Sequence, residues 1–427
     1  MRKMRDSGIE WIGAIPQDWQ LSKIGSLYTQ RNEKVSDKDY QPLSVTMQGI
    51  LPQLATAAKT DDGDNRKLVR AGDFAINSRS DRRGSCGISP LDGSVSLINI
   101  ILTPRTAMHP GYYNWLFHTT LFADEFYKWG HGIVADLWTT RWQEMKSITV
   151  PVPEYAEQER IAAFLDAECA EIDAVLEKTR ASIEEYKKLK QAVITQAVTK
   201  GIRGDRPMKD SGIEWIGDIP AEWRKTQLRH CAAIKSGITL GKKYEKTDSL
   251  VERPYLRVAN VQDGYVDLSV LTTIEVTQDE DLKYRLRAGD VLMTEGGDRD
   301  KLGRGCVWHG EIEPCLHQNH IFAVQTSKDT LLPEFLEYLT VSDVGRSYFD
   351  VTAIKTTNLA CTSSSKVLAF TIPLPSVEEQ AEIVEALNTK CAGIDALIAK
   401  KQQYLTEIEN YKKSLIYEYV TGKKEVV

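Results

Sequence analysis

The side chains best suited to chemistry in this 427-residue chain form two basic clusters in glycine-containing loops. The segments SRSDRRGSCG and GGDRDKLGRG contain Arg79, Arg82, Arg83, Arg299, Lys301 and Arg304. A guanidinium group binds phosphate oxygens and guanine edges through paired N–H donors, and glycine lets a backbone approach its ligand closely. Both clusters follow a shared RAGD sequence. We therefore expect them to occupy equivalent places and to contact DNA, with a solvated surface loop as the alternative.

A second set of polar residues lies near the end of each half of the chain. It comprises Thr139, Thr140, Arg141, Lys355, Thr356, Thr357 and Asn358, and, earlier in the second half, Gln318 and Asn319. Hydroxyl, amide and basic groups donate to phosphates or base edges, and Gln or Asn can pair with adenine. We predict that these residues bind DNA. For Gln318 and Asn319 a buried turn amide is the alternative.

Motifs for catalysis or cofactor binding are missing from the sequence. GITLGKK at Gly237 has neither the spacing nor the final Ser or Thr of a phosphate-binding P-loop, and no GxGxxG, GxSxG or HExxH motif occurs. Cys306, Cys315, His317 and His320 match no common zinc-ligand spacing. We therefore expect a recognition protein without catalytic residues, cofactor or metal.

The elements that must position these residues are short strands and helices. The first half contains the apolar runs FAIN, GSVSLINIIL and SITVPVP, and the second half contains YLRVANV, GDVLMTEG and HIFAVQT, each with an aromatic helical patch near its end. Short apolar runs separated by Gly, Asp and Asn are typical of strands. Each half is predicted to hold an α+β globule.

The chain is an internal duplication. MRDSGIEWIGAIPQDWQ over 4–20 returns as MKDSGIEWIGDIPAEWR over 208–224, with twelve identities in seventeen positions. The segment starting at Pro151 likewise aligns with that starting at Pro373. Two long copies favour a duplicated module with pseudo-twofold symmetry over a solenoid. Trp11 and Trp215 mark the DSGIEWIG segments either as docking segments or as covers for a sheet edge.

Long helices follow the two proline motifs. Their apolar positions repeat at heptad spacing along Leu165, Ile172, Thr179, Tyr186 and Val193, and again along Leu387, Ile394, Lys401, Ile408 and Leu415. Such a seam predicts a coiled coil, and because a single exposed seam is unstable the two helices should pair, in antiparallel fashion. The polar residues on the seam, which include Lys190 and Lys412, either fix the register or extend outward to solvent.

Composition narrows the class of protein. A hydrophobic content of 42% is enough for a sizeable core, and a net charge of −6 excludes a uniformly basic surface. The N-terminus has no apolar signal region and the chain has no membrane-spanning run, so we expect a cytoplasmic protein that binds no membrane. Seven scattered cysteines without a CxxC pair predict reduced thiols.

These motifs resemble a known family over essentially the whole chain. The SGIEWIGxIP segments, the YKK-rich helix ends and the P-x-P-x-x-x-E-Q helix starts are similar to the specificity (S, HsdS) subunits of type I restriction-modification systems. The matching helix-start positions are Pro151, Pro153, Glu157, Gln158, Pro373, Pro375, Glu379 and Gln380. The resemblance implies target recognition domains over 1–153 and 208–375, a central coiled-coil helix over 154–207 and a C-terminal one over 376–427.

The same resemblance implies function and partners. Each recognition domain would read one half of a bipartite asymmetric DNA site, and the helices would set the gap between the halves. Two methyltransferase (M) subunits would supply S-adenosylmethionine chemistry, and restriction (R) subunits would use ATP and magnesium, in host defence. A related system that only methylates or cuts on both sides of its site, or a coiled-coil adaptor that binds proteins, remains the alternative.

Overall fold

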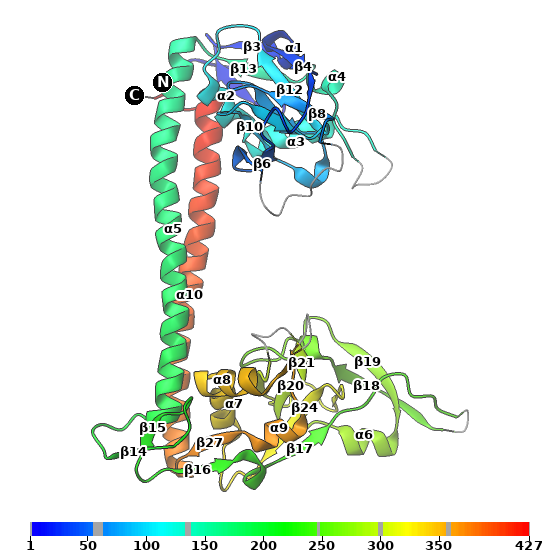
Figure 1. The fold of residues 1–427 in the computed structure, drawn as a ribbon, viewed down its shortest axis with the longest axis vertical. Coiled ribbons are helices and arrows are strands. Elements are labelled where there is room, and N and C mark those ends of the chain that lie inside the picture. The colour runs from blue at the N-terminus through cyan, green and yellow to red at the C-terminus, as the bar shows by residue number, and fades with distance from the viewer. Residues whose placement is uncertain are drawn as a thin grey trace. The chain divides into compact units, whose positions relative to one another are not determined.

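The computed structural model describes residues 2–53, 63–132, 138–245, 248–297, 302–355 and 360–426. The chain divides into two compact units, which we call unit 1 (residues 1–180 with 402–427) and unit 2 (residues 181–401). Each unit contains a globule of strands and short helices together with a part of each of two long helices (Figure 1). The two units are described separately.

Unit 1 is built around a four-stranded antiparallel sheet in the order β10-β9-β12-β4. Its strands are β4 (Tyr28–Arg31), β9 (Phe74–Asn77), β10 (Cys86–Ile88) and β12 (Asn99–Pro104). Smaller sheets pair β5 (Lys34–Val35), β8 (Arg66–Val69) and β11 (Gly93–Val95); β6 (Leu43–Thr46) and β7 (Gly49–Pro52); β1 (Met4–Asp6) and β2 (Ala14–Pro16); and β3 (Gln20–Lys23) and β13 (Thr149–Val152). Its short helices are α1 (Ile24–Leu27), η1 (Ser80–Arg82), α2 (Pro110–Phe117), α3 (Thr120–Lys128) and α4 (Trp142–Met145).

Unit 2 has the corresponding four-stranded antiparallel sheet in the order β22-β20-β24-β17. Its strands are β17 (Ala232–Ser236), β20 (Val291–Thr294), β22 (Gly305–Val307) and β24 (Ile321–Thr326). Smaller sheets pair β18 (Leu250–Leu256), β19 (Thr272–Thr277) and β23 (Leu316–His317); β21 (Gly296–Gly297), β25 (Ile354–Lys355) and β26 (Ala360–Cys361); β14 (Met208–Asp210) and β15 (Asp218–Pro220); and β16 (Arg224–Gln227) and β27 (Thr371–Leu374). Its short helices are η3 (Leu228–His230), η4 (Val258–Asn260), α6 (Gln278–Tyr284), α7 (Pro333–Val341), α8 (Asp343–Thr352) and α9 (Ser364–Ala369).

The shared RAGD sequence forms the turn that leads into the central strand of each sheet. Gly72 and Gly289 have φ of 89° and 96°, a conformation that favours glycine, and the aspartate N–H donates to the arginine carbonyl at 3.0 Å in unit 1 and 2.9 Å in unit 2. The aspartate side chain also accepts from the arginine backbone N–H, at 2.9 Å for Asp73 and 3.0 Å for Asp290. The repeated RAGD sequence is therefore a structural turn.

Asp73 ties the central sheet of unit 1 together. Its buried carboxylate accepts from Arg31 Nε at 2.8 Å and from Thr103 Oγ1 at 2.9 Å, so it links three strands. Asp290 is also buried but has a weaker network, in which Gln325 Nε2 donates at 2.9 Å. A buried carboxylate is stable only when it is paired and hydrogen-bonded in this way.

The long helices are α5 (Tyr155–Lys200) and α10 (Val377–Val420). They pair in antiparallel fashion within each unit, with Asp173 and Arg180 of α5 bound to Lys412 and Glu409 of α10 in unit 1. Their apolar positions belong to the globule cores: Leu165 and Leu415 pack in the core of unit 1. The predicted α+β class and the predicted antiparallel coiled coil are confirmed. Within the described residues no helix is long and apolar enough to cross a membrane.

The lysines on the helix seam bind carboxylates of the opposite helix. Lys190 Nζ lies 2.7 Å from Asp395 in unit 2, and Lys412 Nζ lies 2.6 Å from Asp173 in unit 1. The two pairs occupy corresponding positions of the duplicated helices. Lys190 aligns with Lys412, and Asp173 aligns with Asp395 at the same offset. Partly exposed pairs add little stability. Their directionality suits them to setting the register of the two helices.

The central carboxylate of unit 1 gives a first prediction. Asp73→Ala leaves the half-buried Arg31 guanidinium without its counterion, so we expect a loss of about 3 kcal/mol in the free energy of unfolding of unit 1. Urea unfolding measures it. Asp39→Ala is the matched control, because Asp39 is exposed and its carboxylate pairs with none of the other described residues, so this change should leave the transition unchanged. Equal effects of the two variants would contradict this account.

A half-buried glutamate in unit 2, Glu337, gives a second prediction, for pH dependence. Burial raises the pKa of Glu337 to about 7, although its carboxylate accepts from the Val307 N–H at 3.2 Å. The unfolded chain loses this proton near pH 4.3, so stability falls as the pH rises from about 4.3 to about 7. Glu337→Gln should therefore stabilise unit 2 by about 1–3 kcal/mol at pH 8 and by less at pH 5.

Urea unfolding at both pH values tests the Glu337 prediction. The control is Glu214→Gln, which replaces an exposed carboxylate of the same unit and should change stability at neither pH. A Glu337→Gln gain that is larger at pH 5 than at pH 8 would show that the sign is wrong.

Candidate nucleic-acid interface

Three segments of unit 1 meet where the central strand β9 ends, and we call them the three-segment site: residues 78–83, 96–99 and 138–141. Backbone hydrogen bonds hold them together. The Ser78 carbonyl accepts from Thr140 N–H at 3.0 Å, and the Ser78 hydroxyl donates to the Ile98 carbonyl at 2.5 Å. Arg79 also forms an antiparallel bridge with Thr139. The site thus unites two clusters that were predicted separately from the sequence.

The 96–99 segment is a tight turn at the start of β12. The backbone and side-chain N–H groups of Asn99 donate to the Ser96 carbonyl at 3.1 and 3.0 Å, and Lys67 Nζ donates to the Asn99 carbonyl at 2.6 Å. These bonds leave the two central side chains of the turn on the surface, where Leu97 is 39% and Ile98 is 40% exposed.

The predicted basic residues of unit 1 surround this turn to different extents. Arg79 and Arg82 lie 3.4 and 3.8 Å from the carboxylate of Asp81 between them. Arg83 pairs with Asp124, and Arg141 is exposed at the start of α4. Exposed cations of this kind can exchange their protein partners for phosphate oxygens.

Thr140 differs from the other predicted residues. Its side chain is fully buried and its hydroxyl donates to the Phe126 carbonyl at 2.9 Å. It therefore supports the site from inside. Thr139, one residue earlier, is half-buried and pairs through its backbone with His131 at 3.0 Å.

A depression of about 400 Å³ marks the three-segment site of unit 1. It is lined by Gln30, Lys67, Ser78, Arg79, Leu97, Ile98, Ile100, Thr139, Thr140, Arg141 and Trp142. Basic, hydroxyl and aliphatic groups therefore converge on one concave surface, a combination that suits a ligand with both charged and apolar parts.

Unit 2 contains the same three-segment site in residues 295–297, 318–321 and 360–363. The Glu295 carbonyl accepts from Thr362 N–H at 2.7 Å, Gly296 pairs with Cys361, and the 318–321 turn is closed by Ile321 N–H donating to the Gln318 carbonyl at 2.9 Å. Each bond corresponds to one in unit 1. The two units thus share a backbone arrangement and differ in the side chains that it presents.

Several predicted residues of unit 2 lie outside the described residues: Arg299, Lys301, Thr356, Thr357 and Asn358. The described strands next to these residues belong to one small sheet, in which β26 pairs with both β21, which ends at Gly297, and β25, which ends at Lys355.

Arg304 is held within unit 2 rather than on its surface. Only 13% of its side chain is exposed, its Nη1 donates to Gln262 Oε1 at 2.9 Å, and its Nε lies 4.0 Å from Asp263. Gln318 and Asn319 occupy the 318–321 turn, where both are half-buried and their side-chain amides bond to none of the other described residues.

The four candidate zinc ligands belong mainly to the core of unit 2. Cys306 and Cys315 pack in an apolar cluster, and burial raises the pKa of both thiols to about 12. Burial also lowers the pKa of His317 to about 4, and its Nδ1 lies 3.0 Å from the Ile321 carbonyl. Among the described residues no group of three or more acidic, histidine or cysteine side chains is arranged to hold a metal ion.

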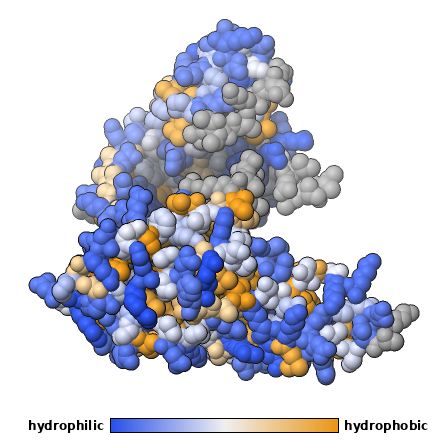
Figure 2. Space-filling model, turned by 60° about the horizontal axis from the view of Figure 1, so that its bottom comes forward, coloured by the Kyte–Doolittle hydropathy of each residue, from blue (hydrophilic) through white to orange (hydrophobic). Residues whose placement is uncertain are grey.

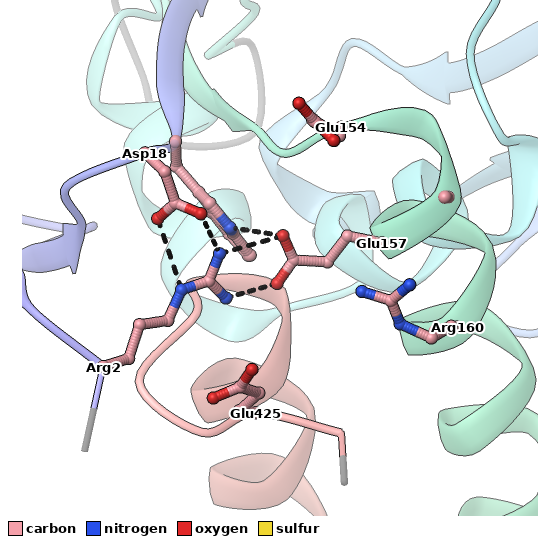
Figure 3. Close-up of a pocket in the computed structure, with 8 residues that line it drawn as sticks. Arg2, Asp18, Glu154, Glu157, Arg160 and Glu425 are labelled. Carbon is pink, nitrogen blue, oxygen red and sulfur yellow. Dashed lines mark hydrogen bonds and ion pairs between the residues drawn. The ribbon is translucent and has the colours of Figure 1, made fainter.

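The Glu-Gln pair that occurs in both copies of the duplication attaches each long helix to its globule. Glu157 accepts from Trp19 Nε1 at 2.9 Å and from Arg2 Nη2 at 3.0 Å, and Arg2 also bonds Asp18 at 2.6 Å. Figure 3 shows Arg2 between the two carboxylates. This ion-pair group lies in a depression of about 280 Å³ that also includes Arg160 of α5.

Unit 2 repeats the attachment with equivalent residues. Glu379 accepts from Trp223 Nε1 at 2.9 Å and from Arg206 Nη1 at 2.6 Å, and Arg206 also bonds Glu222 at 3.0 Å. In both units the guanidinium group lies over the tryptophan ring, at 5.5 Å for Arg2 and 5.2 Å for Arg206.

Comparison with known proteins agrees with this duplicated architecture. No family model matches the chain. The type I restriction enzyme EcoKI specificity subunit of Escherichia coli K12 is 23% identical, over 96% of this chain and 90% of that protein. The MjaVIII specificity subunit of Methanocaldococcus jannaschii is 24% identical, over 96% of this chain and 94% of that protein. This chain is a homologue of type I specificity subunits.

A further relative and two solved structures complete the comparison. A protein of M. jannaschii named for the MjaX specificity subunit is 26% identical over 48% of this chain, which spans about half of that protein (47%). A chain from a structure of a type I R-M system aligns over 96% of this chain and 99% of its own length, with a TM-score of 0.72 at 16% identity. The HsdS subunit of Thermoanaerobacter tengcongensis aligns over 96% and 98%, with a TM-score of 0.51 at 16% identity. These likenesses show that the fold is that of HsdS subunits.

The glutamines of the specificity-subunit motif bond to the backbone. Gln158 Nε2 donates to the Pro153 carbonyl at 2.8 Å, and its Oε1 accepts from the His109 N–H at the start of α2. Gln380 does the same with the Pro375 carbonyl at 3.1 Å and with the Leu332 N–H at the start of α7. Each glutamine therefore connects the long helix of its unit to the start of a neighbouring helix.

The DSGIEWIG segments of the specificity-subunit homologue also have a structural role. Ile12 is fully buried, and its carbonyl accepts from Tyr417 Oη at 2.9 Å and Lys423 Nζ at 2.6 Å near the end of α10. In unit 2, Trp215 packs 6.0 Å from Tyr348. The segment in unit 1 is thus a docking segment for a helix end.

Sequence reasoning missed Leu97 and Ile98. They lie inside the run GSVSLINIIL, which looks like one buried strand, whereas the structure breaks it into β11, a turn and β12. A signal was available. Counted back from the aligned PVP and PLP motifs, residues 96–99 coincide with residues 318–321, where Gln318 and Asn319 had been selected.

The helix attachment gives a third prediction. Glu379→Gln leaves the Arg206 guanidinium, of which 11% is exposed, without its buried counterion. We expect a loss of about 3 kcal/mol in local stability, seen as faster hydrogen exchange over residues 377–390. The matched control is Glu382→Gln. Glu382 lies on the same helix as Glu379, but its ion pair with Arg203 is exposed. Unchanged exchange in Glu379→Gln would contradict the proposed anchoring role.

Proposed function

We propose that this chain is the DNA-recognition subunit of a type I restriction-modification complex, and that each unit reads one half of a bipartite, asymmetric DNA site. The observation that carries the proposal is the three-segment site, which has the same backbone bonds in both units and different side chains. Two equivalent scaffolds with unlike surfaces suit two unlike half-sites. The names of relatives aligned over 96% of the chain support the same role.

The proposed DNA contacts of unit 1 are Arg79, Arg82, Arg83, Thr139 and Arg141. Arginine and hydroxyl groups around a depression suit phosphate contacts, which position a protein on the duplex, and base contacts, which specify sequence. In unit 2 the proposed contacts are Gln318 and Asn319 together with Arg299, Lys301, Lys355, Thr356, Thr357 and Asn358.

The long helices are proposed to set the gap between the half-sites. A helix of 46 residues is about 69 Å long, and half-sites on one face of DNA recur about every 34 Å. The seam pairs Lys190 with Asp395 and Lys412 with Asp173 would keep this spacing constant. In this proposal the recognition domains are 1–153 and 208–375, and the helices fall in 154–207 and 376–427.

We propose a non-catalytic role for this chain. Methylation, with S-adenosylmethionine, is assigned to two methyltransferase subunits, and ATP-dependent cleavage is assigned to restriction subunits. The relatives are named as specificity subunits of restriction enzymes, which fits such a division of labour. The net charge of −6 further suggests that partner subunits supply part of the phosphate-binding charge.

The experiment for this function, and our fourth prediction, is methylome sequencing of cells that express this chain with its methyltransferase partner. We expect methylated adenines in a single split motif that disappear when the chain is omitted. Arg79→Ala/Arg141→Ala should lower methylation of that motif by about tenfold or more, because each hydrogen bond between an arginine and a charged phosphate contributes about 1.5–3 kcal/mol.

The matched control removes the same charge from the helices. Lys187→Ala/Lys188→Ala replaces two exposed lysines of α5, which pair with Glu184 and Glu185 of the same helix, and should leave methylation unchanged. Methylation that is independent of the chain would contradict the proposed function. Equal losses in the two double variants would contradict the proposed site.

A further inference from the structure

The two turns of the three-segment sites are structurally equivalent and chemically opposite. In unit 1 the turn 96–99 precedes β12, and in unit 2 the turn 318–321 precedes β24; each is closed by a backbone hydrogen bond between its first and last residues. The central residues are Leu97 and Ile98 in unit 1, and Asn319 and His320 in unit 2. We call these pairs the turn tips.

The tip of unit 1 exposes two aliphatic side chains. Other groups hold the turn, so its stability does not require these side chains on the surface. Leu97 and Ile98 are 39% and 40% exposed although the turn beneath them is held by the hydroxyl of Ser78 and the ammonium of Lys67. They line the same depression as Arg79 and Arg141. On the face presented in Figure 2, hydrophobic residues occur in small groups among hydrophilic ones, so exposure of a hydrophobic residue is not unusual on that face. What distinguishes this pair is its place between two arginines at the end of a rigid turn.

The tip of unit 2 presents hydrogen-bonding groups at the same place. The Asn319 amide bonds to none of the other described side chains. His320 is exposed and its Nδ1 lies 2.5 Å from Glu295 Oε2, so its ring is held in one orientation. Glu295 itself corresponds to Ser78 of unit 1, since each bonds both the tip and the third segment through its backbone or hydroxyl.

The chemistry of base edges matches this contrast. In the major groove, thymine presents a methyl group that aliphatic side chains contact, whereas adenine presents an N6 donor and an N7 acceptor that asparagine can bind together. A protein partner is a poorer match for unit 1, because the tip is flanked by cations that suit a phosphate backbone. Arg79 and Arg141 would bind phosphates while Leu97 and Ile98 reach the base.

We propose that the turn tips are the specificity-determining residues of the two units: Leu97 and Ile98 read a thymine methyl group by apolar contact, and Asn319 and His320 read an adenine edge by hydrogen bonding. This inference rests on the proposed function. It goes further, because it assigns the difference between the half-sites to two equivalent pairs of side chains.

The test, our fifth prediction, begins with the wild-type chain in its methyltransferase complex and duplexes that carry its methylated motif. Replacing single thymines by deoxyuridine removes only the methyl group, and we expect one such position, in the half-site of unit 1, to weaken binding about fourfold. Replacing single adenines by 7-deazaadenine removes N7 and should weaken binding about tenfold at one position in the other half-site. Both of these measurements use the wild-type chain, so neither depends on the folding of a variant.

Variants then assign each effect to a tip. Leu97→Asn/Ile98→His should abolish the deoxyuridine effect and change one half of the methylated motif, and Asn319→Leu/His320→Ile should abolish the 7-deazaadenine effect and change the other half. Leu91→Asn is the matched control, since Leu91 is 40% exposed in unit 1 outside the depression and should change neither.

The outcomes separate this inference from the proposed function. If the wild-type chain directs methylation but neither analogue weakens binding, or the tip variants keep the original motif, the inference is overturned and the function stands. Loss of the methyltransferase subunits from the tip variants on copurification would make the tip a protein contact and would also overturn it. A wild-type chain that directs no methylation overturns both.

Discussion

The fold depends on a carboxylate at the first turn of each long helix, half-buried at Glu157 and buried at Glu379. Each carboxylate accepts from a tryptophan indole and binds an arginine, and the arginine lies over that indole ring, so the three side chains contact one another. A buried carboxylate is costly unless its partners are complete, which makes the geometry of this joint specific. This joint fixes where each long helix starts relative to the sheet of its own unit. The positions of the other elements of that unit therefore depend on it.

Within each unit, backbone groups hold together the parts that are the same in both units, and side chains form the parts that differ. The three-segment sites are held mainly by backbone groups, such as Thr140 N–H to the Ser78 carbonyl and Thr362 N–H to the Glu295 carbonyl. A backbone bond does not depend on which side chain the residue carries, apart from proline. The sheet and its turns can therefore remain the same while the side chains that face outward change from Leu97 to Asn319.

Sequence reasoning recovered what is periodic or repeated. The heptad seam, down to its interrupting Lys190 and Lys412, and the α+β halves followed from spacing alone, because helix and strand periods are local properties. The individual site residues depend on contacts distant in sequence, which spacing does not reveal. Thr140 is buried because its hydroxyl bonds Phe126 in α3, Arg304 is tied down by Gln262 in another loop, and Leu97 is exposed because Ser78 and Lys67 hold a turn inside an apolar run.

Unit 1 is assembled from both ends of the described chain, and this has a consequence for biosynthesis. Tyr112 Oη donates to the Val420 carbonyl at 2.8 Å, and Leu415 and Val420 complete the core that Trp11 and Ile12 begin. On the ribosome, chains emerge from the N-terminus and domains tend to fold as they appear. Here the unit that starts first has to wait, because unit 2 is complete once residue 401 has emerged, whereas unit 1 still lacks residues 402–427.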